Sequence, residues 1–203
     1  MFEKTISKQT KNSLEELSNL EIVKQFYLAG GTAMALQLGH RTSLDLDFFT
    51  KKNFSEEKLI SVLKDKGKFK LNKKEEQTIH GIFNGTKVSF IYYPYPLVYK
   101  VNKFLGVNLA DVKDIACMKL DAVATRGSKK DFIDLYVLFK DFYSLEKILI
   151  IFKKKYKELD YNIMHILKSL TFFDDAEKEP MPKMHYSLTW KIVKDFFKKE
   201  VHK

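Results

Sequence analysis

The stretch Leu28–Phe49, LAGGTAMALQLGHRTSLDLDFF, holds two motifs that together indicate the fold and a candidate site. The first motif, Gly30-Gly31, follows residues 22–28, which we expect to form a strand, and precedes residues 32–38, which are rich in helix formers. Backbone N–H groups at a strand-to-helix turn bind phosphate together with the helix dipole, and glycine permits close approach. Alone, however, a Gly-Gly pair is more often only a tight turn.

The second motif is the pair of carboxylates in the alternating run 44–49, which we expect to be a strand. Asp45 and Asp47 then share one face, while Leu44, Leu46 and Phe48 point into the core. Two carboxylates so placed repel each other unless a cation lies between them, and Mg²⁺ prefers such ligands together with substrate phosphates. Alone, this pair fits an exposed strand edge; combined with the glycine motif, it is far more specific.

The composition bounds the class of protein. The chain has 203 residues, of which 45% are hydrophobic and 14% aromatic, so it can bury a sizeable core and is not a disordered chain. Its single cysteine, Cys117, excludes a disulfide framework and a cysteine-based zinc site. The longest apolar run, residues 148–152, is too short to span a membrane, and we see no secretory signal. We therefore expect a soluble, cytoplasmic protein.

The net charge of +10 makes polyanions the natural partners. Residues 64–74 hold six lysines against one aspartate, and a second basic cluster comprises Lys153, Lys154, Lys155 and Lys157. Each cluster fits either a phosphate-tracking surface for RNA or DNA, or a solvated helix face and a lysine-protected edge strand. The basic residues include only two arginines, Arg41 and Arg126, and both lie in the segments that other features single out.

A second group of charged residues lies in the segment 114–139. On an expected helix over 108–126, Lys119 and Arg126 share one face with two apolar residues, so these cations are at least partly buried and need partners. Asp131 and Asp134, one turn apart on the next helix, are the candidate partners. Two interpretations stay open: a structural ion-pair network that joins two helices, or an active site in which Lys119 faces phosphates and one aspartate acts as acid, base or orienter.

The expected organisation is α+β: a mixed sheet flanked by helices in residues 1–100, followed by a helical lobe in residues 101–203 that contributes to the active site. Pro94-Tyr95-Pro96 cannot continue a central strand and marks the change. We expect helices over 11–21, 55–66, 108–126, 128–142, 144–157, 160–170 and 187–201, strands over 68–71, 78–83 and 87–93, and no comparable strand after Tyr93.

The two motif-bearing segments resemble the signatures of the AbiEii/AbiGii-type nucleotidyltransferases, a branch of the polymerase-β-like superfamily. These are the toxin halves of bacterial toxin–antitoxin and abortive-infection pairs. The resemblance implies that Gly30, Gly31 and Thr32 hold the phosphates of an NTP, and that Asp45 and Asp47 are catalytic ligands of Mg²⁺, or of Mn²⁺ in its place. It further implies a cognate antitoxin as partner.

The resemblance also assigns roles to the remaining charged residues. It implies that Lys119 and Asp134 line the active site, with Asp131 as a third candidate, and that Arg126 belongs to the nucleotide-binding set. We expect Arg41, in the loop at the rim of the site, to contact phosphate; an alternative is that it pins the loop to Asp45 or Asp47. Lone histidines such as His40 and His80 show no metal-binding spacing.

One position departs from the superfamily pattern. A third carboxylate often lies on the neighbouring strand as base for the incoming hydroxyl, and Ser89 occupies the position that we assign to it. The function we expect is Mg²⁺-dependent transfer of NMP from an NTP to an acceptor hydroxyl, with RNA, a tRNA end first, as acceptor. The alternatives are a small-molecule or protein acceptor, or an NTP-binding module that has lost turnover.

Overall fold

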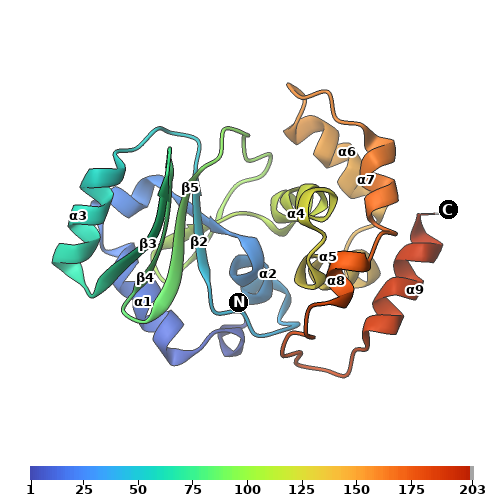
Figure 1. Cartoon of the computed structure of the whole chain (residues 1–203), viewed down its shortest axis with the longest axis horizontal. Coiled ribbons are helices and arrows are strands. Elements are labelled where there is room, and N and C mark those ends of the chain that lie inside the picture. Colours follow the sequence, from blue (N-terminus) through green and yellow to red (C-terminus); the bar gives the residue numbers. More distant parts are fainter. Residues whose placement is uncertain (202–203) are drawn as a thin grey trace.

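The computed structural model describes residues 1–201, which form a seven-stranded mixed sheet with helices on both faces (Figure 1). The strand order is β3-β4-β5-β2-β1-β7-β6. β1 pairs antiparallel with β2 and parallel with β7, and β2 pairs parallel with β5. The strands are β1 Tyr27–Ala29, β2 Leu46–Thr50, β3 Phe69–Glu75, β4 Thr78–Phe83, β5 Thr86–Tyr92, β6 Asn102–Phe104 and β7 Val107–Leu109.

The helices form two layers and a lobe. α1 and α3 cover one face of the sheet, α2 and α4 lie against the other face, and the remaining helices pack beyond α4 (Figure 1). Their bounds are α1 Lys8–Ser18, α2 Gly30–Leu38, α3 Glu56–Lys66, α4 Val112–Arg126, α5 Lys129–Asp141, α6 Leu145–Lys155, α7 Ile163–Ser169, α8 Asp174–Glu177 and α9 Trp190–Glu200, with short 3-10 helices η1 Glu3–Thr5 and η2 Glu21–Gln25. The expected α+β architecture is confirmed.

The alternation in β2 decides which residues face the core. Leu46 and Phe48 are fully buried beneath α1 and α3, and Phe48 stacks on Phe90 of β5 with ring centroids 5.1 Å apart. Because successive side chains point to opposite faces, Asp47 points the other way, into a cleft that residues of α2 and α4 also line. The hydrophobic pattern therefore sets the side of the sheet on which the carboxylate lies.

Three sequence predictions about the elements are wrong. Residues 22–28 are not one strand, because η2 occupies Glu21–Gln25 and only Tyr27–Ala29 pairs in the sheet. Leu44 does not enter the core; it is 50% exposed, and β2 begins only at Leu46. The first helix begins at Lys8, where Ser7 caps it by accepting from the Thr10 N–H at 3.0 Å.

The helix expected over 108–126 begins later, at Val112, and Asp111 caps it. The residues before it form the β6–β7 hairpin, whose turn residues Leu105 and Gly106 both have positive φ, and β7 joins the sheet beside β1. The sequence predicted no strand of comparable strength after Tyr93 and so missed β6 and β7, because three residues each are too few to give a clear pattern. The division of the chain at residue 100 stays a prediction, and the sheet itself extends to Leu109.

A buried ion pair fixes the segment that connects the sheet to the helices. Lys155 of α6 donates to Asp114 of α4 at 2.9 Å and to the Pro96 carbonyl at 2.7 Å, and both charged side chains are fully buried. Asp114 also accepts the backbone N–H groups of Val98 and Tyr99. Lys155, which the sequence placed in a basic cluster on the surface, is therefore buried and joins α4, α6 and the connecting segment.

We expect Lys155→Met to destabilise the protein by about 3–5 kcal/mol, because it leaves the Asp114 carboxylate buried without its cation. Lys154→Met, one residue away and exposed, is the matched control and should leave the free energy of unfolding within about 0.5 kcal/mol. Urea unfolding of both variants measures the difference. Equal midpoints for the two would contradict a stabilising role for this ion pair.

Candidate active site

The two predicted motifs meet in a cleft of about 340 Å³ between the sheet and α4. Gly30, Gly31 and Asp47 line it from the sheet side, and Lys119 and Arg126 line it from α4. The helix face predicted from spacing alone is confirmed, since its apolar members, Ile115 and Ala122, line the same cleft. The site thus combines a helix start, a carboxylate and two cations from segments far apart in the sequence.

The side chains of Asp47 and Arg41 lie so close to Gly30 and Gly31 that a larger residue would not fit at either position. Gly30 has φ of 65°, and a Cβ there would lie 2.7 Å from the Asp47 Oδ2. A Cβ on Gly31 would lie 2.4 Å from an Arg41 guanidinium nitrogen. No side chain caps the start of α2 at Ala29, so its first N–H groups have no side-chain acceptor. An anion in the cleft can supply the missing acceptor.

The two carboxylates of the second motif differ in exposure. Asp47 is half-buried, and burial raises its pKa, an effect to which the nearby charge of Asp45 adds. Asp45 is exposed and lies just before β2, outside the lining of the cleft. Within residues 1–201 no lysine, arginine or histidine forms an ion pair with either carboxylate.

A fully buried carboxylate, Asp134 of α5, organises the cations behind the cleft. Its Oδ1 accepts from His40 Nε2 and from Arg41 Nε, both at 2.7 Å. Its Oδ2 accepts from the second Arg41 nitrogen at 2.9 Å and lies 2.8 Å from Lys119 Nζ. Burial alone would raise the pKa of Asp134, but Arg41 and Lys119 hold it well below its usual range.

Asp131 completes this network one turn earlier on α5. It accepts from Lys119 at 2.6 Å and from Arg126 Nε at 2.8 Å. Lys119 therefore bridges both aspartates, and of its three N–H groups one remains for the cleft. Arg126, whose side chain is 64% exposed, keeps guanidinium hydrogens that do not bind Asp131. The aspartates position both cations and leave donors available to a ligand.

Two expected positions are corrected. Arg41 is not at the rim: it is only 2% exposed, and its carboxylate partner is Asp134 rather than Asp45 or Asp47. The Thr32 side chain, 1% exposed, does not face the cleft; its hydroxyl bonds to Ser43 Oγ at 2.9 Å and to the Asp45 carbonyl. Both side chains hold the loop that carries Asp45, and only the Thr32 backbone N–H remains for phosphate.

The structure contains parts of both interpretations of the hairpin formed by α4 and α5, and it excludes Asp134 as the base. Asp131 and Asp134 do form an ion-pair network between α4 and α5, and the same network positions Lys119 and Arg126 in the cleft. Asp134 already accepts four close contacts, two on each oxygen, so it has no lone pair free to act as a base.

Sequence reasoning missed the segment that closes the loop after α2. His185 donates from Nδ1 to the Gly39 carbonyl and accepts from the Thr42 hydroxyl, both at 3.1 Å. The Thr42 N–H donates to the Lys183 carbonyl at 2.8 Å. Nothing in the local pattern of residues 183–185 indicates this contact, since its partners lie more than 140 positions away. Asp121, which also lines the cleft, was likewise not singled out.

Comparisons with known proteins identify the family of this chain. A family model described as "Nucleotidyl transferase AbiEii toxin, Type IV TA system" matches residues 13–103 and 91–197. The chain belongs to this family. It is a nucleotidyltransferase of the toxin class of a type IV toxin–antitoxin system. An uncharacterized protein of Aquifex aeolicus (strain VF5) is 39% identical over 204 residues, which cover 97% of this chain and 96% of that protein.

Solved structures share the fold of this AbiEii-family chain. MenT4, a nucleotidyltransferase toxin from Mycobacterium tuberculosis H37Rv, has a TM-score of 0.57 at 11% identity, covering 95% of this chain and 81% of that one. A putative nucleotidyltransferase from H. pylori has a TM-score of 0.54 at 19% identity, covering 97% and 94%. Within residues 1–201 no helix is long and apolar enough to cross a membrane.

We expect Asp134→Asn to destabilise the protein by about 3–5 kcal/mol, because Arg41 and Lys119 lose the charge that compensates their burial. The pKa of Asp134 is lowered in the fold, so its stabilisation is present above the unfolded pKa of about 3.9 and is lost as the pH falls through the lower native pKa. Thermal unfolding at pH 7 and in acid measures this. Asp195→Asn, in an exposed ion pair on α9, is the control; equal losses would contradict a special role for Asp134.

We expect Asp47→Asn to raise the Tm of the metal-free protein at pH 7. Because the pKa of Asp47 is raised in the fold, its favourable contribution is present below the unfolded pKa of about 3.9 and is lost as the pH rises through the native value. The ionised carboxylate is thus a cost at pH 7. Mg²⁺ should raise the Tm of the wild type and not of this variant. An unchanged metal-free Tm together with undiminished Mg²⁺ stabilisation would contradict this assignment.

Proposed function

We propose that this protein transfers NMP from an NTP to a hydroxyl group of RNA, in a Mg²⁺-dependent reaction. The observation that carries the proposal is the single cleft that joins the open start of α2, the carboxylate of Asp47 and the cations Lys119 and Arg126. Membership in a nucleotidyltransferase family supports the reaction type. The metal, the nucleotide and the acceptor are the parts of the proposal that experiment must decide.

The N–H groups of Gly30, Gly31 and Thr32 would bind the phosphates, together with the N–H groups that Lys119 and Arg126 direct into the cleft. These donors are fixed before the nucleotide arrives, since Asp131 and Asp134 hold the lysine. Donors aimed in advance at developing negative charge are the main source of catalysis in phosphoryl-type transfers.

Asp45 and Asp47 would hold the divalent cation. The fit rests on two features: Asp47 faces the cleft with a raised pKa, and neither carboxylate has an ion-pair partner among the described residues. No cluster of three or more metal-binding side chains occurs in residues 1–201, so the nucleotide's phosphates would complete the shell. When bound, the metal supplies neutralisation of the charge on the phosphates.

In the reaction, the oxygen of the acceptor hydroxyl forms a bond to the α-phosphorus, and the bond from that phosphorus to the pyrophosphate oxygen breaks. Lys119 and Arg126 would stabilise the departing pyrophosphate.

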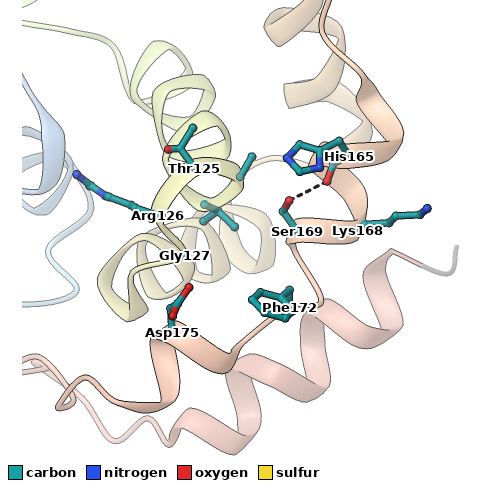
Figure 2. A pocket seen from close by; sticks show the side chains of 10 residues that line it. Thr125, Arg126, Gly127, His165, Lys168, Ser169, Phe172 and Asp175 are labelled. Atoms are coloured by element: carbon teal, nitrogen blue, oxygen red, sulfur yellow. Dashed lines mark hydrogen bonds between the residues drawn. The ribbon is translucent and has the colours of Figure 1, made fainter.

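Basic residues near the cleft favour RNA as the acceptor. Two members of the 64–74 lysine cluster, Lys70 and Lys73, pair with Ile82 and His80 on the face of the sheet that carries Asp47. A second groove, of about 410 Å³, shares Thr125 and Arg126 with the cleft (Figure 2). The ring of Phe172, 57% exposed, lines this groove and could stack on a base.

In this proposal the protein is the toxin of its pair, works in the cytoplasm where its RNA acceptor is found, and is opposed by a cognate antitoxin. The family description supports the pairing. A small-molecule or protein acceptor is the competing possibility, and it would give transfer without salt-sensitive RNA binding. The second competing possibility is an NTP-binding module without turnover, and it is favoured by Ser89, which occupies the position where a carboxylate was expected.

The test is NMP transfer with Mg²⁺, each α-labelled NTP in turn, and total cellular RNA. We expect one NTP to label an RNA band, and Asp45→Ala/Asp47→Ala to reduce the rate at least about 100-fold, because the charge-neutralising centre is lost. Label in protein or in a small product would move the acceptor to that class. Intact NTP in every reaction, with NTP still bound, would contradict transfer and favour the binding module.

A further inference from the structure

Three polar residues form a row across the face of the sheet that borders the cleft. Asp47 of β2 pairs in register with Ser89 of β5, and Ser89 pairs in register with His80 of β4. The His80 Nδ1 lies 3.1 Å from the Ser89 Oγ. All three line the cleft. Ser89 therefore stands between a histidine and the carboxylate beside the glycine motif.

The hydrogen bond between His80 and Ser89 can run in two directions. If the Nδ1–H donates to the Ser89 oxygen, a lone pair remains on Nε2; if the Ser89 hydroxyl donates to Nδ1, the ring proton lies on Nε2. Within residues 1–201 no hydrogen bond occupies Nε2, and it is not a buried, unpartnered nitrogen. In the first tautomer His80 presents a free acceptor at the cleft.

The other acidic groups near the cleft are less suited to accept a proton. Asp131 and Asp134 are occupied by Lys119, Arg41 and Arg126. Asp121 accepts from the Tyr161 hydroxyl at 2.5 Å and interacts with Tyr93 and Tyr156, so it lies at the tyrosine-lined end of the cleft. His80, by contrast, is separated from Asp47 by only Ser89 along the row.

We propose that His80 is the general base of this enzyme, in place of a carboxylate at Ser89; this rests on the proposed nucleotidyl transfer. The acceptor hydroxyl gives its proton to Nε2 while its oxygen bonds to the α-phosphorus and the bond to pyrophosphate breaks. The Lys73–Glu75 ion pair of β3 lies beside His80, with Lys73 opposite it in register. In this proposal Ser89 is a positioning residue that accepts from Nδ1 and so sets the tautomer of the imidazole.

Steady-state transfer by His80→Ala and His80→Gln tests the proposal. We expect kcat to fall about 10²–10⁴-fold with the KM for NTP little changed, because a base acts on the chemical step and not on nucleotide binding. Added imidazole should restore part of the activity of His80→Ala in proportion to its concentration. Ser89→Ala should show a smaller loss that imidazole does not rescue. Asp121→Asn, which alters the carboxylate at the tyrosine-lined end of the cleft, is the matched control and should retain kcat.

The outcomes separate this proposal from the proposed function. A wild type that transfers no NMP to any acceptor would overturn both. Wild-type transfer that survives in His80→Ala, or a large kcat loss in Asp121→Asn instead, would overturn only the role of His80. The tautomer of His80 can also be measured without turnover, from the long-range ¹H–¹⁵N NMR spectrum of the imidazole. The His80 signals are assigned by their loss in His80→Gln. A proton on Nδ1 that depends on Ser89 is expected, and a proton on Nε2 alone would refute the inference.

Discussion

The site depends on one buried carboxylate. Asp134 receives His40 and Arg41 from the loop after α2, and Lys119 from α4, so it joins the two halves of the molecule through charge-assisted hydrogen bonds. A buried charge without partners would be strongly unfavourable, so α4, α5 and the loop must be in place together. Arg41 in turn lies against Gly31, so this network also shapes the turn at the start of α2.

The four aspartates near the cleft differ in their partners. Asp131 and Asp134 form ion pairs with Lys119, Arg41 and Arg126, and so hold these cations in fixed positions. Among the described residues Asp47 and Asp45 have no ion-pair partner, and the proposed function assigns them the divalent cation.

The role of Ser89 depends on its neighbours in the sheet. In the sequence it marks a missing carboxylate, and it favours a lapsed enzyme. In the structure it stands between Asp47 and His80, in register with both, and it orients an imidazole at the edge of the cleft. The histidine lies nine residues earlier on an antiparallel neighbour, so no linear motif connects it to the carboxylate.

Local patterns in the sequence determined the start of α2, the core-facing alternation of Leu46 and Phe48, and the cationic face of α4, because each depends on helix or strand periodicity. The family resemblance added the reaction type. Tertiary structure alone decided that Arg41 and Thr32 are buried, that the β6–β7 hairpin extends the sheet beside β1, and that residues 183–185 close the loop after α2. These features depend on partners distant in the sequence, and periodicity carries no information about which distant segments come into contact.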